Sequence, residues 1–225
     1  MDVLSLIRNN REQQDKVFRQ NERLRTLRDE LRTVAGLALN TEEEPLIVTG
    51  HQPTIYYPGL LFKDYFTGET ARQVNGRAVN FVVDSDVADY QIPLPFLEKG
   101  ALRKNFIGLD NPRQLIYKEY KPTEEAVVRY FDSIGDYVES LSIPTIREAY
   151  EYFRESFFRE YKQGLSFRDT IIWLRNRFDF FLGYDIRDIR ISELVGSVAY
   201  YRYVLYLIEH FETFTAAYNQ SVSDT

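Results

Sequence analysis

The residues best suited to chemistry follow two short apolar runs in the first half of the chain. The first run, 46–48, leads into Thr49-Gly50-His51-Gln52-Pro53, and the second run, 78–83, ends in Asp84-Ser85-Asp86. A helical stretch separates the two runs, so the order strand, loop, helix, strand predicts a parallel βαβ unit and an α/β fold. Because the carboxyl ends of parallel strands meet at one edge of a sheet, these polar groups are expected to share a crevice.

His51 is the first candidate for catalysis, because it directly follows a strand in a turn that contains glycine. An imidazole titrates near neutral pH, so at the mouth of a crevice it can act on a phosphate or a carbonyl group. Thr49 and Gly50 permit close approach of the backbone to a ligand, and the Gln52 side chain adds two donors and an acceptor. The alternative is a histidine that caps the next helix or bonds a loop carbonyl. His210, the second histidine, falls in an apolar helix and is expected to be structural.

Asp84 and Asp86 are the other two candidates for catalysis, with Asp89 as a weaker member of the set. Carboxylate oxygens at a strand end can bind a divalent cation, or accept hydrogen bonds from a substrate amine or hydroxyl group. The alternative is that both aspartates cap the following turn. No residue is assigned as a metal ligand.

Three residues near the start of the intervening helix are candidates for substrate contacts. Lys63 falls in the first turns, where unpaired N–H groups and the helix dipole already favour an anion. Tyr57, with Tyr56 before it, can stack on a base or a sugar ring. The alternatives are a solvated lysine and aromatic side chains that anchor the loop.

Composition narrows the function classes. The chain has 225 residues, 44% of them hydrophobic, so it can form a sizeable core. Its formal net charge of −6 argues against nucleic acid or an anionic membrane as the main partner. The absence of cysteine excludes disulfides and a thiol nucleophile. No secretory signal and no apolar run of about 20 residues is present, so a cytoplasmic protein with a small-molecule substrate is the expectation.

Residues 1–40 are predicted to form an N-terminal helical segment, with one long polar helix over about 1–36. Heptad spacing is convincing only in its second half, through Leu24 and Leu31. Such a helix can lie across the domain surface or pair as a coiled coil with a partner. A solvated linker with Gly36, Asn40 and 42–44 follows and ends at Pro45.

Residues 41–120 are predicted to hold the parallel sheet and an edge hairpin. The helix starts at Pro58 and ends near Gly76, and Gly68 interrupts its pattern. The segment 90–109 carries two prolines in its first arm and the turn 98–100, which indicates an edge hairpin or a long loop.

Residues 121–225 are predicted to be helical and to continue from the core or pack on it. Helices are expected over about 123–141, 144–163 and 166–182, and a last helix is expected from Ser192 to about Asn219. The last helix is densely apolar, which indicates core packing. It also suggests that the chain is the N-terminal part of a longer architecture, or that it self-associates.

The combination VTGHQP, a Pro-Gly turn, a lysine-bearing helix and FVVDSD resembles the N-terminal half of the cysteine-adding enzymes of bacillithiol biosynthesis. The resemblance covers about forty residues. It implies a Rossmann-like core similar to that of nucleotidyltransferases, and a ligase-like reaction that joins an amino acid or similar nucleophile to a sugar-derived substrate. A nucleotide such as ADP or ATP is the cofactor considered.

Four residues, Thr49, Gly50, Gln52 and Pro53, match the first motif of that family. Lys63 corresponds to its helix lysine, and Asp84 and Asp86 to its acidic strand end. Two departures matter: His51 stands where the family has glutamine, and Ser85 stands where the family has a histidine between the two acids. The role of that histidine therefore does not transfer.

The sequence contains none of the common dinucleotide, phosphate-loop, nucleophile-elbow or zinc-protease motifs. We favour an enzyme, a ligase or transferase, that uses the crevice between the two strand ends. Two alternatives stay open: a non-catalytic binding or assembly module that docks through its helices, and a nucleotidyltransferase-like or glycan-pathway transferase.

Overall fold

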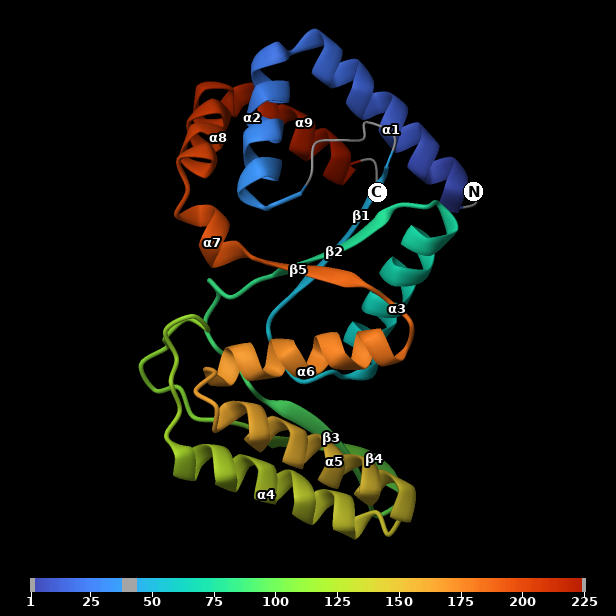
Figure 1. Ribbon diagram of the computed structural model, residues 1–225, viewed down its shortest axis with the longest axis vertical. Helices are drawn as coiled ribbons and strands as arrows, with labels where there is room; N and C mark the ends of the chain where they lie inside the picture. The colour runs from blue at the N-terminus through green and yellow to red at the C-terminus, as the bar shows by residue number, and fades with distance from the viewer. Residues whose placement is uncertain (1–2, 38–43, 224–225) are drawn as a thin grey trace. The chain divides into compact units, whose positions relative to one another are not determined.

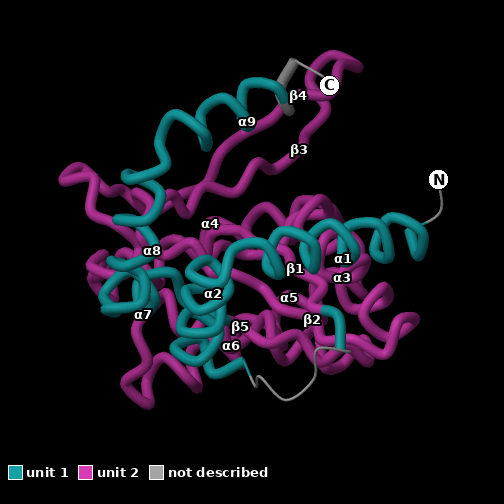
Figure 2. The backbone as a smooth tube through the Cα atoms, turned by 90° about the horizontal axis from the view of Figure 1, so that it is seen from above, with its two compact units in different colours: residues 1–45, 189–225 teal, residues 46–188 magenta. Residues whose placement is uncertain are grey.

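A computed structural model describes residues 3–37 and 44–223 (Figure 1). The chain divides into two compact units, residues 46–188 and residues 1–45 with 189–225, which Figure 2 colours separately. The boundaries near residues 40 and 120 expected from the sequence stay predictions, because compactness does not show which part folds alone. Most of the predicted linker, 38–43, lies outside the described residues.

The predicted parallel unit is present in residues 46–188. Strand β1 (Leu46–His51) pairs in parallel with β2 (Arg77–Val82), and helix α3 (Pro58–Gln73) connects them. β2 is the central strand, because β5 (Ile186–Arg190) completes a three-stranded sheet in the order β1-β2-β5. The structure is therefore a mixed α/β fold with a small sheet that contains parallel strands and many helices.

The sequence reading missed β5, because it predicted only helices after residue 122. The two buried residues of this strand, Ile186 and Ile189, are three positions apart, with charged residues between them. Such spacing does not show the alternation that identifies a half-buried strand. Pairing with the rest of the sheet, rather than local pattern, decides the conformation of this segment.

Helix α3 runs without a break through Gly68, although this glycine weakened the sequence-based prediction of a continuous helix. Tyr184 covers Gly68 closely: a Cβ atom built on the glycine would lie 2.6 Å from Cδ1 and 2.9 Å from Cβ of Tyr184. The helix packs on the sheet through Ala71, Ala78 and Ile186. Gly68 is therefore required for close packing rather than for a bend.

Replacing Gly68 by alanine is expected to lower the free energy of unfolding by about 1–3 kcal/mol, because the new methyl group overlaps the Tyr184 side chain. Urea unfolding followed by circular dichroism measures the change. The Tyr184→Ala background is the control, since removing the ring should make Gly68→Ala nearly neutral. An equal loss in both backgrounds would contradict this explanation.

The hairpin is confirmed, but it does not lie at the edge of the parallel sheet. Strands β3 (Ile92–Glu98) and β4 (Ala101–Ile107) pair antiparallel and form a separate two-stranded sheet. The two turn residues, Lys99 and Gly100, have φ angles of 51° and 80°. Two successive positive φ angles characterise the tight turn that best matches the twist of a hairpin.

Three helices complete this unit: α4 (Glu124–Ser140), α5 (Pro144–Tyr161) and α6 (Phe167–Phe181). The side chain of Ser166 caps α6 by accepting from the Asp169 backbone N–H. Their core is largely aromatic, and its largest fully buried members are Tyr117, Phe131, Phe157 and Phe167.

The second unit contains α1 (Val3–Gln20), α2 (Glu22–Val34), α7 (Ile191–Val195), α8 (Val198–Glu209) and α9 (Phe211–Ser223). The single long N-terminal helix predicted from the sequence is wrong. Asn21 separates α1 from α2 and caps α2 by accepting from the Leu24 N–H. Asparagine favours such a cap because its side chain competes with helical backbone hydrogen bonds.

The single C-terminal helix expected from Ser192 to Asn219 is also wrong, since breaks fall at Gly196-Ser197 and at His210. α8 packs antiparallel to α2: Asn21 bonds the Tyr206 hydroxyl at 2.6 Å, and Glu30 pairs with Arg202 at 2.8 Å. His210 donates from Nδ1 to the carbonyl of Tyr206 at 2.9 Å and stacks on the Tyr206 ring, a structural role as predicted. In the described ranges, no helix combines the length and apolar character needed to cross a bilayer.

Candidate functional site

A cavity of about 540 Å³ lies within residues 46–188, where the loops that follow β1 and β2 meet. Its wall includes Gln52, Tyr57, Asp86, Asp89, Tyr117 and Tyr130. The Gln52 side-chain amide donates to Oδ2 of Asp86 at 3.2 Å, so the two loops are joined across the cavity. The structure thus brings together three of the predicted site residues, Gln52, Tyr57 and Asp86.

Asp86 also performs the capping role that the sequence left open. Its Oδ1 accepts from the Val87 backbone N–H at 2.8 Å, while Oδ2 faces Gln52. Both Asp86 and Asp89 are exposed, and both line the cavity. Two exposed carboxylates and the half-exposed ring of Tyr57 therefore face this cavity.

His51 differs from the expected imidazole at the mouth of the crevice, because its side chain is buried, with 3% of its surface exposed. Nδ1 lies 3.1 Å from the Gln52 carbonyl oxygen, and Nε2 lies 3.1 Å from both carboxylate oxygens of Asp64. Nε2 also lies 2.7 Å from Nη2 of Arg175. A guanidinium only donates, so Nε2 either accepts from Arg175 or donates to Asp64, and cannot do both.

Asp64, on α3, is the centre of this buried group. Burial alone would raise the pKa of its carboxyl group, but hydrogen bonds from His51 and Tyr56 and the nearby charge of Arg175 lower that pKa below its usual value. Arg175 Nη2 lies 3.7 Å from Asp64 Oδ2. Asp64 therefore carries its charge at neutral pH, balanced by the arginine.

Tyr56 bridges two carboxyl groups from different helices. Its hydroxyl oxygen lies 2.5 Å from Oδ2 of Asp64 and 2.7 Å from Oδ2 of Asp179, which is on α6. Burial raises the pKa of Tyr56, and it also raises the pKa of Asp179 to about 6, where the neighbouring charge of Asp64 adds to the rise. Burial likewise raises the pKa of Asp188, which accepts from the Asn80 amide at 2.7 Å.

The main chain of Gln52 connects this buried group to the cavity. Its carbonyl oxygen accepts from Arg175 Nη1 at 3.1 Å and lies at the same distance from Nδ1 of His51. Its side chain meets Asp86 in the cavity wall. Four buried residues, His51, Asp64, Arg175 and Asp179, together with the half-buried Tyr56, therefore hold the turn that presents Gln52, and these five residues are called the buried cluster below.

Asp84 is not open to the cavity, because its side chain is fully buried. Its Oδ2 accepts from Nη1 of Arg168 on α6 at 2.8 Å, and its backbone carbonyl accepts from the Lys118 N–H at 3.0 Å. The cation that faces this carboxylate is thus an arginine of the chain itself. The expectation of two facing acids in one crevice is wrong for Asp84 and right for Asp86.

The remaining predicted residues lie outside the cavity wall. Thr49 is half-buried and pairs in register with Asn80 of β2. A Cβ atom on Gly50 would lie 3.4 Å from the Phe81 carbonyl oxygen, so the close approach is to β2 rather than to a ligand. Lys63 is exposed on α3. Their assignment to substrate binding stays a prediction.

Sequence reasoning did not identify Asp64, Arg175 or Asp179 as site residues. One signal was available in the apolar segment 171–182, where an arginine and an aspartate stand four positions apart among large apolar residues. Charged residues are rarely fully buried unless they are paired, so an i, i+4 pair on a core helix indicates a buried polar group. Nothing comparable marks Asp64, whose neighbour Lys63 is exposed.

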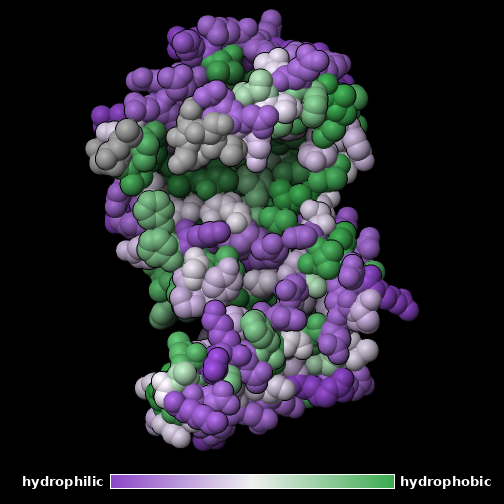
Figure 3. All heavy atoms as spheres, turned by 180° about the vertical axis from the view of Figure 1, so that it is seen from behind, coloured by the Kyte–Doolittle hydropathy of each residue, from purple (hydrophilic) through white to green (hydrophobic). Residues whose placement is uncertain are grey.

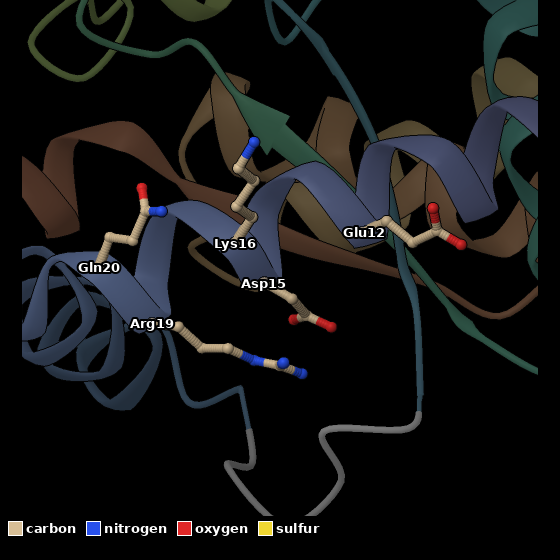
Figure 4. A pocket seen from close by; sticks show the side chains of 5 residues that line it. All are labelled: Glu12, Asp15, Lys16, Arg19 and Gln20. Atoms are coloured by element: carbon tan, nitrogen blue, oxygen red, sulfur yellow. The ribbon is translucent and has the colours of Figure 1, made fainter.

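A second cavity, of about 300 Å³, lies on α1 (Figure 4). All five of its lining residues come from that one helix: Glu12, Asp15, Lys16, Arg19 and Gln20. The side chains carry both signs of charge and point in different directions in the close view. They do not converge on a common point, so this hollow is a weaker candidate than the cavity beside Gln52.

Comparison of the chain with models of protein families, with curated proteins and with solved structures finds no match. Within the described residues, no three histidine, aspartate or glutamate side chains are grouped so that they could hold a metal ion.

Proposed function

We propose that this chain is an enzyme of the ligase or transferase class that binds a small sugar-derived or amino-acid substrate in the cavity lined by Gln52 and Asp86. The observation that supports this proposal most strongly is the Gln52–Asp86 bridge at the ends of two parallel strands, with the buried cluster directly behind it. Ligands of open α/β sheets bind in this position, outside the carboxyl ends of the strands.

The groups in the wall favour a ligand that donates hydrogen bonds. Asp86 and Asp89 are acceptors, so an amine or several hydroxyl groups would match them. Tyr57, which is half exposed, provides a flat face on which a sugar ring can pack, whereas Tyr117 and Tyr130 line the cavity as buried core residues. An amino sugar has both features, which agrees with the sugar-derived substrate implied by the resemblance in the first motif.

The proposed roles follow the positions of the side chains. Asp86 binds the amine or hydroxyl group and is the proposed general base, and Gln52 orients the ligand. His51, predicted to be catalytic, is proposed to act through Gln52, because the imidazole holds the carbonyl of that residue. Asp84, also predicted to be catalytic, is proposed to fix the second loop through Arg168.

A Rossmann-like core and a nucleotide cofactor remain part of the proposal. The parallel β1–α3–β2 crossover supports the first. The second is supported by the resemblance in the first motif and not by the start of α3, where Pro58 has no N–H and the N–H groups of Leu60 and Leu61 both donate to the Tyr57 carbonyl.

Isothermal titration calorimetry with glucosamine, and with glucose as the neutral comparison, tests the proposed ligand class. We expect glucosamine to bind, and Asp86→Asn to weaken it by about tenfold or more, because a charged hydrogen bond contributes about 1.5–3 kcal/mol. Asp132→Asn, a change on the exposed face of α4, is the matched control and should leave the affinity unchanged. No heat from a folded sample with either sugar would contradict the proposal.

An assembly module is the second candidate, because α8 carries an exposed apolar face. Four side chains spaced along one side of this helix are more than half exposed: Val198, Tyr201, Leu205 and Ile208. In the space-filling view, apolar side chains reach the surface over the region of α8 (Figure 3). Contiguous exposed apolar surface is typical of interaction sites.

Changing Leu205 and Ile208 to glutamate should reduce self-association in sedimentation velocity, because each new charge opposes burial of this face. The matched control is Glu212→Gln, a polar change on the neighbouring helix α9. A wild-type chain that sediments as a monomer at every concentration would exclude self-association through α8.

A further inference from the structure

We infer that the buried cluster holds one proton more than the same side chains would hold on the protein surface at the same pH. Asp179 and Asp64 share this proton through the hydroxyl group of Tyr56. Loss of the proton is a pH switch built into the fold. This inference concerns regulation by pH and does not depend on the identity of the ligand.

The geometry of Tyr56 requires the additional proton. The phenol has a single hydrogen, yet its oxygen lies within 2.7 Å of carboxylate oxygens on both sides. Two such short contacts are both hydrogen bonds only when one carboxyl group is protonated and donates to the phenol oxygen, while the phenol donates to the other carboxylate. With a single proton, the second contact would place two acceptors against each other.

The surroundings decide which carboxyl group is protonated. Asp64 faces Arg175 and His51 as well as Tyr56, so its charge is compensated. Asp179 faces Tyr56 from the loop, Asp64 from α3, Arg175 one turn earlier on its own helix, and Asp188 from β5. Two of its four charged or titratable neighbours are carboxylates, and it is buried. The proton therefore resides on Asp179, and its pKa of about 6 agrees with this assignment.

Loss of the proton changes the charge of the cluster beside the Gln52 turn. With Asp179 neutral, the charges of Asp64 and Arg175 balance. With Asp179 ionised, a second buried carboxylate competes for the same guanidinium, which also donates to the Gln52 carbonyl. The turn that presents Gln52 should therefore loosen as the pH rises through about 6.

The sign of the stability effect follows from the raised pKa. Between the ordinary value of 3.8 and about 6, the folded state holds the Asp179 proton and the unfolded state does not. Stability contributed by this proton is thus present at low pH and is lost as the pH rises to about 6. The lowered pKa of Asp64 acts in the opposite direction, but only at more acidic pH.

The inference is tested by ¹³C NMR of the side-chain carboxyl carbons of the full chain between pH 4 and 8, with urea unfolding at the same pH values. We expect the Asp179 carboxyl signal to titrate near pH 6, and the unfolding equilibrium constant to rise by up to about a hundredfold from pH 4 to 7 through this group. Asp179→Asn should remove that step, because the amide N–H can donate to Tyr56 at every pH.

The matched control is Asp185→Asn, an exposed aspartate in the following loop, which should leave the step unchanged. Tyr56→Phe, which removes the shared hydroxyl, should move the titration of Asp179. An Asp179 signal that titrates near pH 4, or an equal pH dependence in Asp179→Asn, would overturn the inference.

Discussion

Replacing Arg175 by methionine is expected to lower the free energy of unfolding by about 3–5 kcal/mol, because it leaves the buried Asp64 carboxylate without its compensating charge. The change also removes the donor to the Gln52 carbonyl. Methionine has a similar length, so a simple loss of volume does not explain an effect of this size. Urea unfolding at pH 7 measures the difference.

Two further variants separate charge from packing at this position. Arg177→Met, on the exposed face of the same helix, should cost less than about 1 kcal/mol. The double variant Arg175→Met with Asp64→Asn should recover part of the lost stability, since the unpaired charge is gone. A loss below about 1 kcal/mol in Arg175→Met would contradict the view that this arginine neutralises the cluster.

Replacing Arg168 by methionine should have a comparable cost, about 3–5 kcal/mol, because Asp84 is fully buried and faces this guanidinium at 2.8 Å. The consequence for the site is indirect. Asp84 anchors the loop that carries Asp86 into the cavity wall, so ligand affinity should fall with stability. Thermal unfolding and calorimetry on the same sample measure both effects.

Asp84→Asn in the Arg168→Met background tests whether the buried charge is responsible. If it is, the double variant should be more stable than Arg168→Met alone, while Arg113→Met, an exposed arginine elsewhere in the same unit, should be near neutral. Loss of stability in the double variant equal to the sum of the single changes would show that the two residues act independently.

The parallel unit could be predicted from the sequence because its signals are local. The apolar run before Thr49, proline at the start of α3 and the β-branched run of β2 all indicate the same arrangement. The hairpin was equally accessible, since Lys99-Gly100 specifies its turn. β5 was not, because its buried residues do not alternate. The break at Asn21 could not be predicted either, because a single polar side chain interrupts an otherwise continuous helical pattern.

The site was only partly accessible from the sequence, for a physical reason. Gln52 and Asp86 follow strands, and parallel pairing brings strand ends together, so their proximity could be expected. The direction in which a strand-end side chain points depends on register. Register turns His51 and Asp84 into the interior, where each meets a residue of α6 more than eighty positions away in the chain.

The central claim, that the cavity lined by Gln52 and Asp86 binds a small ligand rich in amine or hydroxyl groups, is tested most directly by a crystal structure of the full chain soaked with glucosamine. We expect density for the sugar in this cavity, with its amine within hydrogen-bonding distance of the Asp86 or Asp89 carboxylate and its ring against Tyr57. An empty cavity in crystals that remain ordered at saturating glucosamine, or a sugar bound only elsewhere, would contradict it.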